Sequence, residues 1–127
     1  MKVLALDYGA ARTGVAVSDP TGTLARPLCV VQRASSEAGL ARLAELVRDE
    51  QAERVVVGLP LTLRGERGAQ VGETERFLDA LREVLEVPVD TFDERFTTAL
   101  AARGGEAPED ARAAAHLLSS YLAWVSR

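Results

Sequence analysis

The sequence predicts an α/β domain in which a mixed sheet is flanked by helices. Short apolar runs typical of strands alternate with longer stretches whose apolar residues recur at helical spacing. The first two runs are separated by a turn too short for a crossover helix, so part of the sheet must be antiparallel. With 127 residues the chain has the size of one domain, and we expect a single domain over residues 1–127.

The N-terminal third predicts three strands. Residues 2–8 and 13–18 are aliphatic runs separated by the sequence GAAR, and Gly9 and Gly14 flank the turn. This pattern is typical of a β-hairpin. A third short run, LCVVQR at 28–33, predicts a third strand.

The first helix is expected to follow this strand. Ser35 or Ser36 can accept hydrogen bonds from the first turn and so cap its N-terminus. One predicted buried face carries apolar residues at the i, i+3, i+4 and i+7 positions: Leu40, Leu43, Ala44 and Val47.

Two further strands and at least two helices are predicted in the rest of the chain. RVVVGLP at 54–60 is typical of a central strand buried on both sides, and TLRGERGAQ at 62–70 predicts an exposed, mobile loop. An amphipathic helix over about 70–86 precedes the short strand 87–92. The last helix is predicted over 108–125.

A brief helix is also predicted between the last strand and the last helix. Thr97 or Thr98 would cap it, and Gly104 and Gly105 would end it.

Composition restricts the possible functions. The net charge of −4 argues against a general nucleic-acid coat, but it permits a local arginine cluster and suits a metal site lined by carboxylates. A single cysteine, Cys29, excludes an internal disulfide, and a single lysine, Lys2, leaves little scope for lysine chemistry. The sequence has neither a long apolar run nor a signal-peptide pattern, so we expect a cytoplasmic protein with no membrane partner.

Asp7 is the first candidate site residue. Strand alternation places it on one face with Val3 and Ala5, at the carboxyl edge where α/β sheets usually hold their sites. Alternatively, Asp7 initiates the turn or accepts a hydrogen bond from the amide of Gly9. Position alone leaves both interpretations open.

Further acids come from the C-terminal part of the chain. Asp110 shares a helical stripe with Ala114, Leu117 and Tyr121, so it is expected to face the sheet. Its alternative role is a favourable interaction with the helix dipole. Asp93 and Glu94 are adjacent and would point to opposite faces of an extended chain, so we expect only one of them to join Asp7.

Three acids gathered in one place would repel one another, and a hard divalent cation relieves that repulsion. Such ions also polarise phosphates and generate hydroxide for in-line attack. The residues therefore predict metal-assisted hydrolysis of phosphodiesters.

Four segments in this order resemble the YqgF/RuvX family: LALDYGAARTGVAVSD, VVVGLPLTLRGERGAQ, DERFTT and DARAAAHLLSSYL. The resemblance implies a ribonuclease-H-like fold with a five-stranded sheet. It also implies a nuclease that matures the 5′ end of pre-16S ribosomal RNA or resolves Holliday junctions. The family's acids fall on Asp7, Glu94 and Asp110, which implies that these three residues are catalytic and bind Mg²⁺ or Mn²⁺.

Four arginines are candidates for phosphate contacts, because guanidinium groups match phosphate oxygens: Arg12, Arg64, Arg67 and Arg95. Each could instead be a solvated surface charge, and Arg95 could form an ion pair beside Glu94. In the family's turn a lysine usually precedes the arginine, whereas GAART keeps only Arg12.

The predicted function is a Mg²⁺-dependent endonuclease that processes the 5′ end of pre-16S rRNA in ribosome biogenesis. One alternative is a Holliday junction resolvase acting on branched DNA in recombination and repair, which should be a symmetric dimer. Another is a non-catalytic nucleic-acid-binding factor. A third is an ATPase, since DYG followed by GVAV resembles a phosphate motif of sugar kinases, although those enzymes need two domains. The partner is expected to be structured RNA or branched DNA, and the protein a monomer or homodimer.

Overall fold

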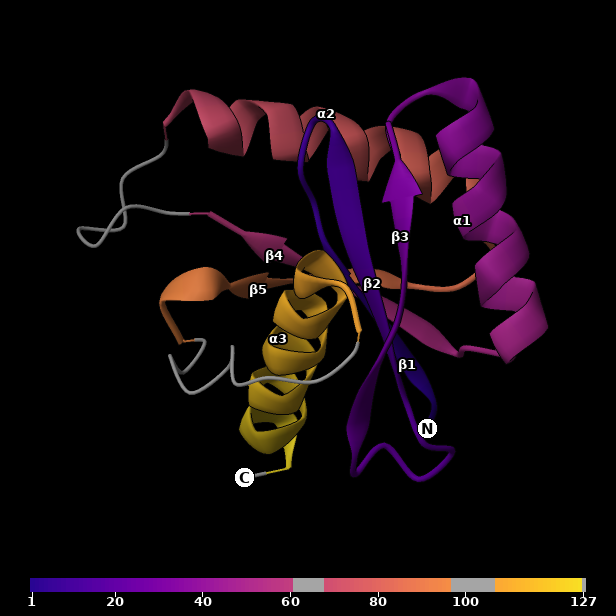
Figure 1. Ribbon diagram of the computed structural model, residues 1–127, viewed down its shortest axis with the longest axis vertical. Coiled ribbons are helices and arrows are strands. Elements are labelled where there is room, and N and C mark those ends of the chain that lie inside the picture. Colours follow the sequence, from indigo (N-terminus) through magenta and orange to yellow (C-terminus); the bar gives the residue numbers. More distant parts are fainter. Residues whose placement is uncertain (61–67, 97–106, 127) are drawn as a thin grey trace.

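The computed structural model describes residues 1–60, 68–96 and 107–126 and shows a five-stranded mixed sheet with helices on both faces (Figure 1). The strands are β1 (Val3–Asp7), β2 (Arg12–Ser18), β3 (Ala25–Gln32), β4 (Arg54–Leu59) and β5 (Val89–Asp93). The helices are α1 (Glu37–Glu50), α2 (Ala69–Val84) and α3 (Glu109–Val125), with a 3₁₀ turn, η1 (Glu94–Phe96), after β5. The predicted fold class is confirmed.

The sheet has the strand order β3-β2-β1-β4-β5, with β1 at its centre. The pairs β1–β2 and β2–β3 are antiparallel, whereas β1–β4 and β4–β5 are parallel. This topology confirms the predicted hairpin. It also places the end of β1, and with it Asp7, in the middle of the carboxyl edge.

The two faces of the sheet carry separate apolar cores. Leu4 and Leu6 of β1 pack with side chains of α1 and α2, while Val3 and Ala5 pack with side chains of α3. Figure 1 shows α3 in front of the sheet, α2 along the top and α1 at the right-hand edge. Asp7 continues the alternation of Val3 and Ala5, so it lies on the α3 face, as predicted.

Helix α1 begins as predicted. The Ser36 hydroxyl accepts a hydrogen bond from the amide of Gly39 at 3.0 Å and thereby satisfies one of the free donors of the first turn. On the face turned to the sheet, Leu43 and Val47 are buried, while Leu40 and Ala44 lie at its margin and are partly exposed.

β3 begins at Ala25, earlier than the predicted residue 28, and includes Pro27. A proline cannot donate to a neighbouring strand, so it is normally confined to the edges of a sheet. β3 is an edge strand, and its register with β2 shifts between Val15 and Ala16, where Pro27 pairs. The predicted loop around Arg64 and Arg67 and the predicted short helix at Thr97 lie outside the described residues.

Within the described ranges, no helix combines the length and the apolar character needed to cross a bilayer.

Helix α3 touches the backbone of β2 at Gly14. A Cβ atom built at Gly14 would lie 1.8 Å from the carbonyl oxygen of Asp110 and 3.0 Å from the amide nitrogen of Ala111. Gly14 is also the partner of Asp7 in the β1–β2 ladder. The missing side chain therefore lets the first turn of α3 lie directly beside the end of β1.

Replacing Gly14 by alanine should push α3 away from the sheet. We expect the free energy of unfolding to fall by about 2 kcal/mol, because the clash is with backbone atoms that cannot rotate away. Urea denaturation measures the change.

The matched control is Gly72→Ala in α2, where the nearest neighbouring atom to an added Cβ is a guanidinium nitrogen of Arg76 at 3.7 Å. Alanine in that helix should stabilise the protein by up to about 1 kcal/mol. Equal effects of the two substitutions would contradict the packing described for Gly14.

Candidate active site

Two carboxyl groups are hydrogen-bonded to each other at the carboxyl edge of the sheet. Asp7 ends the central strand β1, and Glu94 begins η1 directly after β5. The two side chains share a hydrogen bond, although β4 lies between the strands that carry them. The side chain of Glu94 must therefore reach across β4 to meet Asp7.

Gly58 of β4 provides the room for this crossing. Leu6 pairs with Val57, so Gly58 lies beside Asp7 at the next step of the ladder. A Cβ atom at Gly58 would lie 2.7 Å from Oε1 and 3.0 Å from Cγ of Glu94. Any other residue at this position would compete with Glu94 for the same space.

Burial is the main cause of a raised pKa in both acids. Burial raises the pKa of Glu94 from its ordinary value of 4.5 to about 7, and the charge of Asp7 and the hydrogen bond to Asp7 add to this shift. Burial also raises the pKa of Asp7; the hydrogen bond from Glu94 opposes that rise, and the charge of Asp110 adds to it. Near neutral pH the two groups thus behave as one coupled pair that holds a proton, donated by Glu94 to Asp7.

Asp110 lies close enough for its charge to affect Asp7, but its carboxylate is bound to Arg12. Nε of Arg12 donates a hydrogen bond to Oδ2 of Asp110 at 2.9 Å. The two side chains are 62% and 40% exposed, respectively. An ion pair this exposed contributes at most about 1 kcal/mol, so other partners can displace either side chain at little cost.

These acids fit a hard divalent cation in their chemistry. Their ligand atoms are all oxygen, and a cation would stabilise the charged forms of Asp7 and Glu94 against the burial and the neighbouring charge that raise their pKa values. As the described residues are arranged, no three Asp, Glu, His or Cys side chains are close enough to enclose an ion. Asp7 and Glu94 would hold it, and Asp110 would have to move toward them to join the ligand set.

Asp93 and Arg95 form a pair of their own. Oδ2 of Asp93 accepts a hydrogen bond from Nε of Arg95 at 2.8 Å, and the pair lowers the pKa of Asp93. Of the two adjacent acids, Glu94 is hydrogen-bonded to Asp7, and Asp93 is bound to Arg95. Alternation predicted that only one of them would join Asp7 and left open which one. Arg64 and Arg67 lie outside the described residues.

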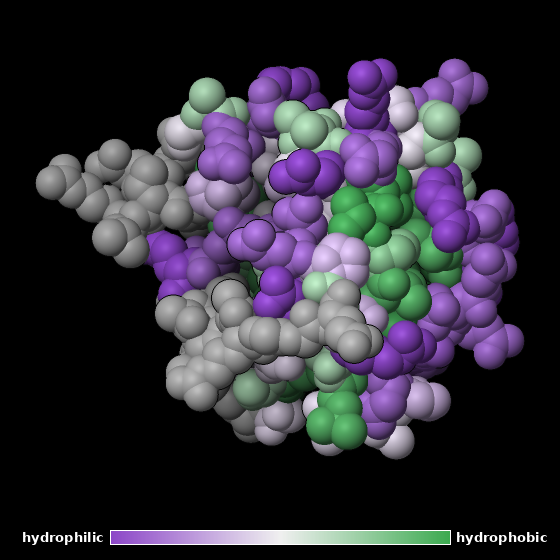
Figure 2. Space-filling model, in the orientation of Figure 1, coloured by the Kyte–Doolittle hydropathy of each residue, from purple (hydrophilic) through white to green (hydrophobic). Residues whose placement is uncertain are grey.

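The polar and apolar parts of this side of the molecule are separate. Figure 2 shows hydrophilic side chains gathered between α2 and the first turn of α3, where the candidate site lies. Apolar side chains gather over β3, whose central residues are only half-buried. The site therefore opens to solvent through a polar surface.

The mixed five-stranded sheet with β1 at its centre and helices on both faces is a ribonuclease-H-like fold. The fold matches T. thermophilus RuvC in complex with a Holliday junction substrate, with a TM-score of 0.68 and 21% identity over 99% of this chain and 95% of that one. A family model described as "RuvX: Holliday junction resolvase" matches residues 1–124, and the chain belongs to this family.

Two relatives carry the same name, "Putative pre-16S rRNA nuclease". The protein from Chloroflexus aggregans is 48% identical over 99 residues, which cover 78% of this chain and 70% of that protein. The protein from Desulforudis audaxviator is 42% identical over 132 residues, which cover 96% of this chain and 94% of the relative. The predicted family is thereby confirmed.

The glycines of the site were harder to recognise from the sequence than the acids. Gly58 interrupts the β-branched run VVVG, and such a glycine often marks a close approach of other atoms to a strand. That signal indicates a close contact, but it does not identify Glu94 as the contacting residue.

Replacing Glu94 by glutamine should change how stability depends on pH. Because the folded state holds the proton of Glu94 up to about pH 7, the wild-type protein should lose stability as pH rises from about 4.5 to about 7. The glutamine side chain of the variant keeps a donor to Asp7 and has no proton to lose. With EDTA present, the variant should be more stable than wild type at pH 8 and no more stable at pH 4. The expected gain in unfolding free energy at pH 8 is about 1–2 kcal/mol, which is less than the full pKa shift would give because Glu94 is partly exposed.

Thermal unfolding at the two pH values measures this difference. Glu83→Gln, at an exposed position of α2, is the control and should shift the midpoint equally at both pH values. A gain for Glu94→Gln that is the same at pH 4 and pH 8 would contradict the shared proton.

Proposed function

We propose that this protein is a metal-dependent nuclease that hydrolyses phosphodiester bonds with Asp7, Glu94 and Asp110 as its catalytic acids. The observation that carries the proposal is the hydrogen-bonded Asp7–Glu94 pair at the carboxyl edge, with Asp110 in electrostatic range. Two half-buried carboxyl groups in contact weaken the fold unless something neutralises them, and strongly shifted groups of this kind concentrate at functional sites.

Asp7 and Glu94 would hold Mg²⁺ or Mn²⁺, and Asp110 would complete the ligand set. Such an ion, when bound, neutralises phosphate charge and lowers the pKa of a coordinated water. Arg12 holds Asp110 through an exposed contact. When Asp110 turns toward Asp7, the guanidinium of Arg12 is released and can donate to phosphate oxygens of the substrate.

The other arginines have supporting roles in this proposal. Arg95 follows Glu94 in the chain and could contact phosphate while bound to Asp93. Arg64 and Arg67 follow β4 in the sequence and are proposed to contact the substrate from that segment.

The proposed substrate is the 5′ end of pre-16S rRNA, in ribosome biogenesis in the cytoplasm. The relatives' name supports this choice, and one of them aligns over nearly its whole length. The family description and the RuvC neighbour support branched DNA as the second candidate. In either case we propose that residues 1–127 act as a single nuclease domain.

Asp7→Asn should abolish cleavage while the fold is retained. The amide is neutral and cannot replace a charged metal ligand, so we expect a loss of at least about 100-fold in rate. Cleavage of precursor rRNA, linear duplex and a four-way junction by wild type and variant, with Mg²⁺ and with EDTA, measures the effect.

Asp79→Asn, on the exposed face of α2, is the matched control and should cleave like wild type. Paired cuts in the junction by a dimer, without cleavage of rRNA, would favour the resolvase. Tight binding that EDTA does not change, with no cleavage of any substrate, would instead identify a non-catalytic binding factor.

Arg12→Gln should weaken use of the substrate more than it weakens binding of the metal. Losing one charge-assisted hydrogen bond to phosphate lowers kcat/KM by about 10-fold. Mg²⁺ affinity, measured by calorimetry, should stay the same or increase, because Asp110 no longer has to leave an ion pair.

The control is Arg42→Gln, which removes another exposed ion pair, that of Arg42 with Glu45. Its kcat/KM should match that of wild type. A large loss of Mg²⁺ affinity in Arg12→Gln would show that Arg12 supports the acids instead of the substrate.

A further inference from the structure

A pocket opens at the same edge of the sheet, on the face opposite the acids. Its volume is about 390 Å³, and it lies between the turn after β1, the start of α1 and the first half of α2. The side chains important for its chemistry are Tyr8, Ser35, Glu73, Arg76 and Phe77. None of these residues belongs to the proposed catalytic machinery.

Tyr8 connects the pocket to the candidate active site. It directly follows Asp7, but its ring packs with the core under α1 and α2, whereas Asp7 lies on the α3 face. The ring stacks on Phe77 with the centroids 4.3 Å apart and the planes 18° from parallel. Phe77 is 1% exposed, so Tyr8 is supported by a fixed side chain.

The Tyr8 hydroxyl has no hydrogen-bond partner among the described residues, and the ring is only half-buried. A fixed aromatic ring that lines an open pocket and keeps a free polar group suits a flat heterocyclic ligand. Nucleobases bind in this way, because every base has a π-face that can contact an aromatic side chain.

Arg76 supplies positive charge at the same pocket. Its side chain is exposed on α2 and forms no ion pair within the described part of the chain. A guanidinium group with no carboxylate bound to it is available for a phosphate. Ser35 adds a hydroxyl, and Glu73 adds an acceptor for the amino group of a base.

We propose that this pocket is a nucleotide subsite, in which an unpaired base contacts Tyr8 and the adjoining phosphate contacts Arg76. The proposal rests on the proposed nuclease function. Asp7 and Tyr8 are consecutive residues that face opposite sides of one sheet edge. A nucleic-acid strand that crosses this edge would therefore pass both residues. The subsite would therefore favour substrates with an unpaired nucleotide close to the bond that is cut.

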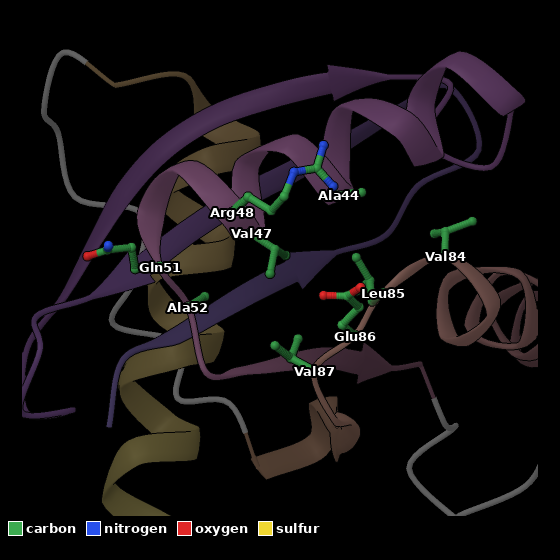
Figure 3. Close-up of a pocket in the computed structure, with 9 residues that line it drawn as sticks. All are labelled: Ala44, Val47, Arg48, Gln51, Ala52, Val84, Leu85, Glu86 and Val87. Carbon is green, nitrogen blue, oxygen red and sulfur yellow. The ribbon is translucent and has the colours of Figure 1, made fainter.

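Another pocket on this side of the sheet lacks these features and supplies a control. Figure 3 shows that it lies between the C-terminal end of α1 and residues 84–87, which include the last residue of α2 and the segment that follows it. It measures about 240 Å³, and none of the described residues that line it is aromatic. Arg48 lines it and is exposed like Arg76.

The test uses the Asp7→Asn protein, which should bind without cleaving. The probes are single-stranded oligonucleotides of ten nucleotides that carry 2-aminopurine, one of RNA and one of DNA. Their fluorescence reports both the affinity and the stacking of the base. Comparing the RNA probe with the DNA probe shows which backbone the protein prefers. Adding Tyr8→Leu or Arg76→Gln should weaken binding by about 5- to 20-fold, and Tyr8→Leu should also abolish the change in 2-aminopurine fluorescence. Adding Arg48→Gln should change affinity less than about 2-fold, as expected for a charge outside the contact.

Affinity unchanged by both Tyr8→Leu and Arg76→Gln would overturn the subsite and leave the nuclease proposal intact. The subsite would also be overturned if Arg48→Gln lowered the affinity as much as Arg76→Gln does, or if the variants lost as much affinity for a fully paired duplex. Either result would show a general electrostatic attraction between the protein and nucleic acid. Arg76 is exposed, so Arg76→Gln remains informative if Tyr8→Leu fails to fold. Absence of any oligonucleotide or duplex binding, together with absence of cleavage by wild type, would refute the nuclease proposal itself.

Discussion

The contact between the carboxyl groups of Asp7 and Glu94 is the constraint around which the edge of the sheet is built. Burial makes the charged form of each acid unfavourable, and two carboxyl groups in hydrogen-bond contact cannot both ionise freely. The fold nevertheless enforces the contact, because β1 and β5 are fixed on either side of β4 and Glu94 directly follows β5. This arrangement lowers the free energy of unfolding at neutral pH. Strongly shifted acids of this kind are found mainly at functional sites.

Two glycines make this arrangement possible, one on each side of Asp7. Gly14 pairs with Asp7 from β2, and Gly58 lies beside it on β4. The space above Gly14 is filled by the backbone of Asp110, and the space above Gly58 by the side chain of Glu94. One row of the sheet thus reads glycine, aspartate, glycine, and each glycine admits a different acid to the neighbourhood of the same aspartate. The separation of Asp7, Glu94 and Asp110 along the chain is overcome by sheet register and by two missing side chains.

The sequence allowed the elements and the positions of Asp7 and Asp110 to be predicted because those depend on local periodicity, whereas the choice of Glu94 over Asp93 came from the family resemblance. The hairpin, the buried strand around Val56 and the inward stripe that begins at Asp110 all follow from spacings of two to four residues. Contacts between distant residues could not be predicted in this way. Arg12 and Asp110 are 98 positions apart, and their pairing depends on where α3 crosses β2. The ion pair between Arg95 and Asp93 depends on the side-chain conformation of Arg95 in a 3₁₀ turn, and periodicity does not describe that conformation.

The charge of the chain bears on how a polyanionic substrate could be recognised. With a net charge of −4, the protein has little general attraction for phosphates, and in the proposed function three acids would face the scissile phosphate. Affinity must then come from a few local contacts that act at short range. Arg12 sits at the acids, and Arg76 with the stacked Tyr8–Phe77 pair sits on the other side of the same edge. A protein built in this way gains affinity mainly from substrates that reach both sides at once, so its selectivity would rest on the shape and unpaired bases of the nucleic acid instead of its total charge.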